Sequence, residues 1–137
     1  MDIDGVIVGT SSPQSDVIDL LHWVIKHHSG STYWLTTHCQ RGANRCIEYL
    51  RRHFFPDDLL KEMDVVFKPT DWDVLKTEAI DFSQDFIWLD DSPLQSEMSV
   101  LRARDAVEKC IVMDAKNPMM ARFALAKLEA IHGIDLQ

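Results

Sequence analysis

The sequence has few cysteines, glycines and prolines among its 137 residues, and it has no long run of apolar residues. No apolar stretch approaches the roughly 20 residues that a membrane-spanning helix requires. The acidic start lacks the basic and then apolar pattern of a signal peptide. The cysteines are odd in number and show no C-x-x-C spacing, so we expect free thiols in the reducing cytoplasm. These residues are Cys39, Cys46 and Cys110.

Positive charge is also in short supply. Lysine and arginine total 14 against 22 aspartates and glutamates, which gives a net charge of -8. This charge repels nucleic acids overall, although a local basic face could still bind one, so a nucleic-acid partner stays open. With 46% hydrophobic and 26% charged residues, the composition is that of a globular protein. We expect residues 1–137 to form one domain with its own hydrophobic core.

Two kinds of apolar pattern alternate along the chain. Helical spacing of apolar residues predicts helices over 16–28, 42–55, 73–80, 95–104 and 117–133, and a short helical turn over 57–63. Short apolar or β-prone runs predict strands over 3–8, 32–35, 65–67, 86–89 and 110–113. This alternation predicts an α/β fold: a three-layer, Rossmann-like sandwich with a mostly parallel central sheet.

The first five residues carry an acidic pair. Asp2 and Asp4 stand one residue apart and are followed by Gly5. On an extended strand, residues i and i+2 project to the same side, so both carboxylates point toward one place. Two such charges at close range need a cation, or one of them takes up a proton. Taken alone, the pattern also fits a surface turn.

Polar residues follow two other predicted strands. Thr36 comes directly after the strand at 32–35, and Asp90 and Asp91 end the apolar run at 86–89. In parallel sheets, ligands bind outside the carboxyl ends of the strands. We therefore expect these side chains to lie near the acidic pair at the start of the chain.

Together these residues form an ordered series along the chain. An acidic D-x-D-G is followed by an apolar strand with a threonine, then a lysine, then an apolar strand with Asp-Asp. The series, over residues 2–91, resembles the haloacid dehalogenase (HAD) superfamily, whose four motifs come in this order. The resemblance implies a magnesium-dependent phosphohydrolase that forms an aspartyl phosphate. Its substrate would be a phosphorylated small molecule or macromolecular end. The short segments between the motifs imply a member without a cap domain.

The resemblance also implies a role for each site residue. Asp2 would be the nucleophile, and Asp4 would be the general acid and then the general base. Thr36 would donate a hydrogen bond to a phosphoryl oxygen. Asp90 and Asp91 would bind Mg²⁺ together with Asp2 and Asp4, the latter through its carbonyl. The second acidic residue favours a phosphatase over a dehalogenase.

The lysine of the series has two candidates. Lys76 lies a short distance before the Asp-Asp pair, whereas Lys68 sits with Pro69 at the end of the strand predicted at 65–67. Either lysine would keep Asp2 ionised and offset phosphoryl charge. We favour Lys76 as the catalytic lysine and keep Lys68 as the alternative.

Two other interpretations compete with this one. In the HAD family an apolar strand leads into the first aspartate, whereas only Met1 precedes Asp2 here. This departure favours an alternative function, a catalytically weak or inactive HAD-like module that binds a partner. Receiver domains also combine acidic residues, a threonine and a lysine around Mg²⁺, but their acidic pair comes first. The order in this sequence argues against a receiver.

Overall fold

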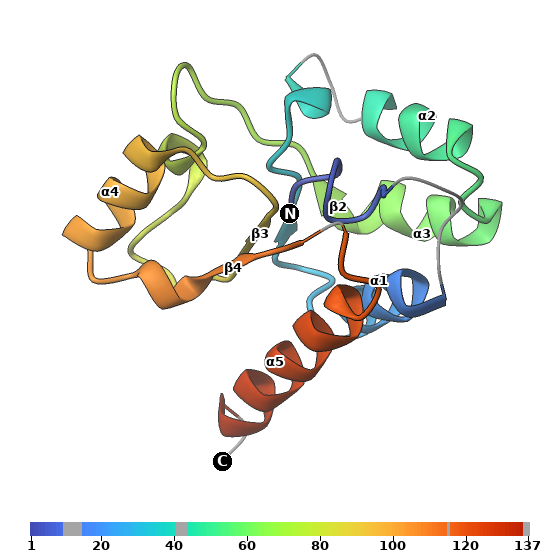
Figure 1. Cartoon of the computed structure of the whole chain (residues 1–137). Helices are drawn as coiled ribbons and strands as arrows, with labels where there is room; N and C mark the ends of the chain where they lie inside the picture. Colours follow the sequence, from blue (N-terminus) through green and yellow to red (C-terminus); the bar gives the residue numbers. More distant parts are fainter. Residues whose placement is uncertain (10–14, 41–43, 115, 136–137) are drawn as a thin grey trace.

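The structure is a computed structural model that describes residues 1–9, 15–40, 44–114 and 116–135 (Figure 1). Its α-helices in this part of the chain are α1 (Ser15–His27), α2 (Asn44–Arg52), α3 (Asp57–Val66), α4 (Gln95–Ala103) and α5 (Met120–Asp135). Its strands are β1 (Thr32–Tyr33), β2 (Phe67–Lys68), β3 (Trp88–Asp90) and β4 (Cys110–Val112). Its short 3-10 helices are η1 (Thr37–Cys39), η2 (Lys76–Ala79) and η3 (Val107–Lys109). The start of the helix predicted at 42–55 lies outside the described residues.

The strands form two parallel pairs. Strand β1 pairs with β2, with Thr32 opposite Phe67, and β3 pairs with β4, with Leu89 opposite Ile111. Helices connect the paired strands, which is the connection that parallel pairing requires. The α/β class and the parallel pairing expected from the sequence are confirmed.

The first two residues lie between the two pairs. The Met1 amino group donates to the Tyr33 carbonyl at 2.9 Å, and Leu35 N–H donates to the Met1 carbonyl at 2.8 Å. On the other side, Asp2 N–H donates to the Leu89 carbonyl at 2.9 Å. The backbone of Met1–Asp2 therefore connects β1 to β3.

The strand predicted over 3–8 is wrong. The Ile3 carbonyl accepts hydrogen bonds from Val6, Ile7 and Val8 N–H at 3.2, 2.9 and 3.0 Å, which folds this segment into a tight turn. Gly5 allows the turn because its φ is +77°, a backbone conformation that residues other than glycine rarely adopt. Asp4 and Val8 retain one isolated parallel bridge.

The strand predicted over 65–67 is also wrong in part. Helix α3 continues through Val66, and β2 begins only at Phe67. The helix buries one face through Leu59, Leu60, Met63 and Val66 while Val65 is 84% exposed. A run of apolar residues alone did not distinguish the end of a buried helix from a strand.

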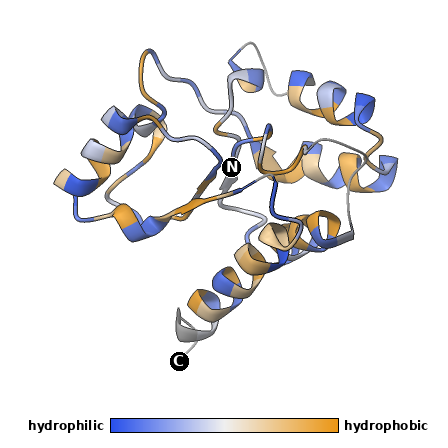
Figure 2. Ribbon diagram, in the orientation of Figure 1, coloured by the Kyte–Doolittle hydropathy of each residue, from blue (hydrophilic) through white to orange (hydrophobic). Residues whose placement is uncertain are grey.

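Apolar side chains form two clusters. The larger one contains the buried face of α1, with Leu20, Leu21 and Val24, and parts of α2, α3 and α5. The smaller one contains residues of η2 and α4 and is built around Leu35, Trp88 and Leu101, all buried, near the β3–β4 pair. Figure 2 shows apolar residues along β4 and mixed apolar and polar surfaces on α2 and α5.

All three cysteines are buried and free, as expected. In the described part of the chain, no helix combines the length and apolar character needed to cross a bilayer.

Candidate functional site

Three carboxylates come together where the Met1–Asp2 segment and β3 end. Asp2, Asp90 and Asp91 each offer an oxygen, and these oxygens all lie within 4.8 Å of one another. Asp2 and Asp90 are buried, and Asp91 is half-buried. Within the described residues, this is the one group of three or more potential metal ligands at such range. Carboxylate oxygens are the hard donors that Mg²⁺ prefers, so the donor set fits this ion.

Lys76 supplies the positive charge of the site. Its Nζ lies 2.7 Å from Asp90 Oδ2 and 3.1 Å from Asp2 Oδ2. Lys68, the alternative, has an exposed side chain whose Nζ lies 5.8 Å from the Tyr33 ring centre. The structure therefore brings Lys76, and not Lys68, to the acidic residues.

Glu97, which the sequence analysis did not identify, positions Lys76. The Glu97 carboxylate is buried and accepts hydrogen bonds from Lys76 N–H at 2.6 Å and Leu94 N–H at 2.8 Å. It thereby holds the start of η2 against the start of α4. A glutamate three residues after a helix N-cap is a recognisable capping signal, but the contact with Lys76 joins residues 21 positions apart.

The charges of the site shift one another's ionisation. Burial, and then the neighbouring Asp90 carboxylate, raise the pKa of Asp2 against the opposing effect of Lys76. Burial, and then the charges of Asp2 and Asp90, also raise the pKa of Asp91. Burial alone would lower the pKa of Lys76, but its hydrogen bond to Asp90 and the two nearby carboxylates raise it. The lysine stays protonated beside carboxylates that repel one another.

Gly5 lies directly against Asp91. A Cβ atom built on Gly5 would be 2.1 Å from Asp91 Oδ2 and 2.6 Å from Asp91 Cβ. The turn after Asp2 thus approaches the Asp91 side chain as closely as a glycine permits. The glycine of the D-x-D-G series serves both the turn and this contact.

Asp4 points to different partners from those expected. Its carboxylate accepts a hydrogen bond from Tyr49 Oη at 2.5 Å and lies 2.9 Å from His38 Nε2. The His38 and Tyr49 rings stack with their centres 4.0 Å apart. We expected the carboxylate of Asp4 to lie with those of Asp2, Asp90 and Asp91, and this expectation is wrong. Within the described residues, the close acidic group has three members, and Asp4 is outside it. The separation by 34 and 45 positions explains why sequence spacing did not reveal His38 and Tyr49.

These contacts also change the acidity of Asp4. Burial raises its pKa, but the hydrogen bonds with Tyr49 and His38 outweigh burial and lower the pKa overall. The hydrogen bond between Tyr49 and the Asp4 carboxylate raises the pKa of Tyr49 to about 12. In this conformation Asp4 is held as a carboxylate.

Thr36 lies beside the start of the chain. It follows Leu35, whose N–H bonds the Met1 carbonyl, and it is 1% exposed. Its hydroxyl accepts a hydrogen bond from His38 N–H at 3.4 Å and so caps η1. Thr36 therefore orients the segment that carries His38.

The chain matches no family model, and neither a curated protein nor a solved structure matches it.

The acidic group generates a prediction about metal binding. We expect Mg²⁺ to raise the melting temperature, because a ligand that binds only the native state stabilises it. The double variant Asp90→Asn, Asp91→Asn should lose this rise. A matched control, Asp57→Asn with Asp58→Asn, changes two adjacent exposed aspartates of α3 and should keep it. Thermal unfolding with and without Mg²⁺ measures the effect. An equal rise in the Asp90, Asp91 double variant would remove these residues from the metal site.

The contact between Gly5 and Asp91 generates a second prediction. Gly5→Ala should lower the melting temperature by several degrees and weaken the response to Mg²⁺, because the new methyl group displaces Asp91 and strains the turn. Gly9→Ala is the control, since nothing lies within 4 Å of a Cβ at that position. Identical melting curves for the two variants would contradict the tight contact.

Proposed function

We propose that this chain is a magnesium-dependent phosphohydrolase that acts through an aspartyl phosphate formed on Asp2. The observation that carries the proposal is the buried Asp2 carboxylate, held by Lys76 beside Asp90 and Asp91. Acidic metal ligands, a nucleophilic carboxylate and a fixed positive charge are what phosphoryl transfer needs. The HAD-like order of these residues along the chain supports the same proposal.

The proposed fold is a Rossmann-like sandwich of three layers. The backbone bonds of Met1–Asp2 support a sheet in the order β2, β1, Met1–Asp2, β3, β4. Neighbouring residues of its strands belong to different apolar clusters. Trp34, Leu89 and Ile111 belong to the larger cluster, while Leu35, Trp88 and Cys110 belong to the smaller one. Because side chains alternate across a strand, this division supports a sheet covered on both faces.

The site then lies at the carboxyl ends of parallel strands, where α/β proteins bind ligands. The segments between Asp4, Thr36 and Asp90 contain, among their described residues, only α1, α2, α3, two short strands and two 3-10 helices. This supports a domain without a cap and an open site. An open site accommodates a small phosphate ester or the phosphorylated end of a macromolecule.

In the proposed reaction, an Asp2 oxygen attacks phosphorus. The bond from phosphorus to the leaving oxygen breaks, and that oxygen takes a proton from Asp4, which has first left His38 and Tyr49 and taken up that proton from solvent. Water then attacks the aspartyl phosphate and gives a proton to Asp4, which releases inorganic phosphate and restores the Asp2 carboxylate. Lys76 keeps Asp2 ionised despite its burial, and its charge offsets that of the phosphoryl oxygens.

Magnesium would be held by Asp2, Asp90 and Asp91 and by the Asp4 carbonyl. When bound, it supplies positive charge against the phosphoryl oxygens. The carboxylate of Asp4 remains on the exposed side of the turn, with 58% of its side chain accessible. In the proposed reaction it exchanges its contacts with His38 and Tyr49 for the leaving group.

The contacts of Asp4 also favour the second candidate function. A module that binds a partner without hydrolysis has no need for a free general acid, and here His38 and Tyr49 engage that carboxylate. Hydrolysis of a generic aryl phosphate with and without Mg²⁺ separates the two candidates. Magnesium-dependent turnover supports the phosphohydrolase, and its absence supports the binding module.

The position of Lys76 generates a prediction about catalysis. Lys76→Met should lower turnover by about 10²–10³-fold, the usual effect of removing one charge-stabilising donor. Lys68→Met is the matched control and should leave turnover near that of the native chain, because its side chain is exposed and contacts Tyr33. Steady-state hydrolysis of the aryl phosphate checks both variants. A larger loss in Lys68→Met would transfer the role to Lys68.

The covalent step generates a further prediction. Asp2→Asn should abolish turnover, because an amide of the same shape cannot carry the phosphoryl group. Beryllium fluoride, which imitates an acyl phosphate, should bind the native chain and not this variant. Asp4→Asn should still form the aspartyl phosphate from a substrate with a good leaving group, and mass spectrometry should detect its slow breakdown. Turnover in Asp2→Asn, once deamidation to aspartate is excluded, would make water the nucleophile.

A further inference from the structure

Two of the three buried cysteines form a pair. Cys39 ends η1, Cys46 lies in the first turn of α2, and these two elements pack against each other. Both side chains belong to the larger apolar cluster, with 3% and 0% of their surface exposed. Cys110 lies in β4 and belongs to the smaller cluster. The third thiol is therefore in a different part of the core.

The paired thiols act on each other directly. Burial, and then the charge of Cys39 and a hydrogen bond with its sulfur, raise the pKa of Cys46 to about 12. A hydrogen bond between two thiols requires their sulfurs to be neighbours. A small rearrangement then brings the sulfurs to the bond length of a disulfide, about 2 Å.

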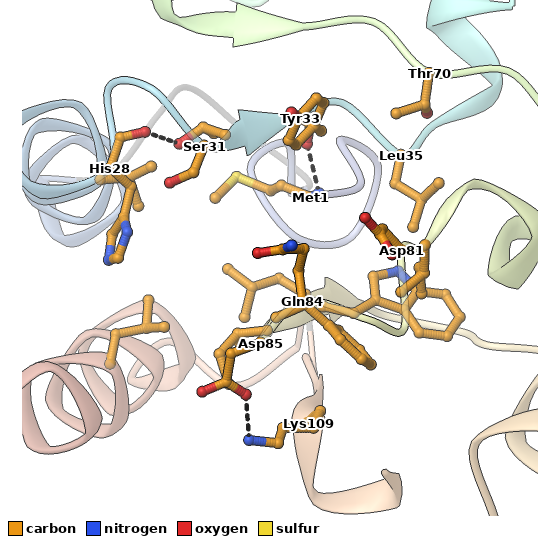
Figure 3. A pocket seen from close by; sticks show the side chains of 18 of the residues that line it. Met1, His28, Ser31, Tyr33, Leu35, Thr70, Asp81, Gln84, Asp85 and Lys109 are labelled. Carbon is orange, nitrogen blue, oxygen red and sulfur yellow. Dashed lines mark hydrogen bonds and ion pairs between the residues drawn. The ribbon is translucent and has the colours of Figure 1, made fainter. Parts of the chain in front are cut away.

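Cys39 is the more accessible thiol of the pair. Its Sγ donates to the Thr36 carbonyl at 3.1 Å and lies 3.3 Å from the Thr70 carbonyl. Thr70 in turn lines a pocket of about 790 Å³ (Figure 3). A small solute in this pocket comes within one residue of Cys39, whereas Cys46 is fully buried. A small oxidant therefore meets Cys39 first.

The two elements that carry these thiols also hold the Asp4 carboxylate. His38 precedes Cys39 in η1, and Tyr49 lies about one turn after Cys46 in α2. The two rings stack on each other, and both side chains contact Asp4. A covalent bond between the sulfurs would fix η1 to α2 and keep the two rings closed around Asp4.

We propose that Cys39 and Cys46 are a redox-sensitive pair, which a peroxide converts to a disulfide that locks η1 to α2. The disulfide itself is independent of phosphohydrolase activity. Its consequence rests on the proposed function: Asp4 stays with His38 and Tyr49 and does not reach the leaving group. Oxidation then switches catalysis off, and a thiol reductant restores it. In a reducing compartment such a disulfide is transient, as a regulatory one needs to be.

The oxidation proceeds in two steps, with hydrogen peroxide as the oxidant. The Cys39 thiolate attacks a peroxide oxygen, the O–O bond breaks, and the departing hydroxide takes up the thiol proton as water. The Cys46 sulfur then attacks the sulfur of the resulting sulfenic acid, and the S–O bond breaks. The hydroxyl leaves with the Cys46 proton as a second water. Two thiols are thus oxidised to one disulfide, while one peroxide is reduced to two waters.

The first test identifies the linkage in the folded chain. The chain is treated with hydrogen peroxide, alkylated, unfolded and digested with trypsin. Cleavage after Arg41 and Arg45 places the two cysteines in different peptides. A linked pair of these peptides that dithiothreitol separates, with Cys110 alkylated, is the expected result. Alkylated thiols throughout, linkage to Cys110, or a sulfinic acid at Cys39 without linkage would overturn the proposal.

Two variants complete this test. Cys110→Ser should form the linkage as the native chain does, because its thiol lies in the other cluster. Cys46→Ala should leave Cys39 without a partner, so no linked peptides should appear. Linked peptides that depend on Cys110 would contradict the pair.

The second test measures the consequence for the site by hydrolysis of the aryl phosphate. The oxidised native chain should turn over at least about tenfold more slowly than the reduced chain, and dithiothreitol should restore the rate. Cys46→Ala, treated in the same way, should keep its rate. An unchanged rate in the linked chain, or an equal loss in Cys46→Ala, would overturn the hold on Asp4. If the reduced chain shows no magnesium-dependent turnover, the proposed function and this consequence fail together, while the peptide linkage still decides the disulfide.

Discussion

The architecture depends on the backbone of two residues, Met1 and Asp2. Their hydrogen bonds to Tyr33, Leu35 and Leu89 connect two parallel strand pairs that, in the described part of the chain, share no other strand pairing. The same bonds set the position of the Asp2 side chain, because its own N–H is bound to β3. The connection of the strand pairs and the position of the Asp2 side chain therefore depend on the same backbone hydrogen bonds. Disruption of this short segment would separate the two strand pairs and also move the nucleophile that we propose.

Electrostatic repulsion is the main difficulty of such a site. Three carboxylates within a few ångströms destabilise one another, and burial increases the effect because water no longer screens them. Lys76 offsets part of the negative charge, and Glu97 holds the lysine in place through its backbone N–H. One lysine cannot balance all three carboxylates. The remaining negative charge is what gives the site its expected affinity for a divalent cation.

The two ends of the parallel strands have different chemistry. The carboxyl ends carry charged and hydrogen-bonding groups, with the Asp4, His38 and Tyr49 contacts at their open side. The opposite ends carry a mostly apolar pocket that Asp81, Asp85 and Lys109 also line.

Local sequence patterns determined most of the helices, the α/β class and the acidic residues of the site. Periodicity located α1 and α4 nearly to their ends, because each helix buries one regular face and exposes the other. Only the tertiary structure decided which lysine lies against the acidic residues, since Lys76 and Lys68 both follow Thr36 and precede Asp90 in the chain. It also decided that Asp4 turns to His38 and Tyr49, and that α3 continues through Val66. These features depend on contacts between residues far apart in the chain. The free energy of such contacts outweighs local conformational preferences, and the spacing of neighbouring residues does not reveal them.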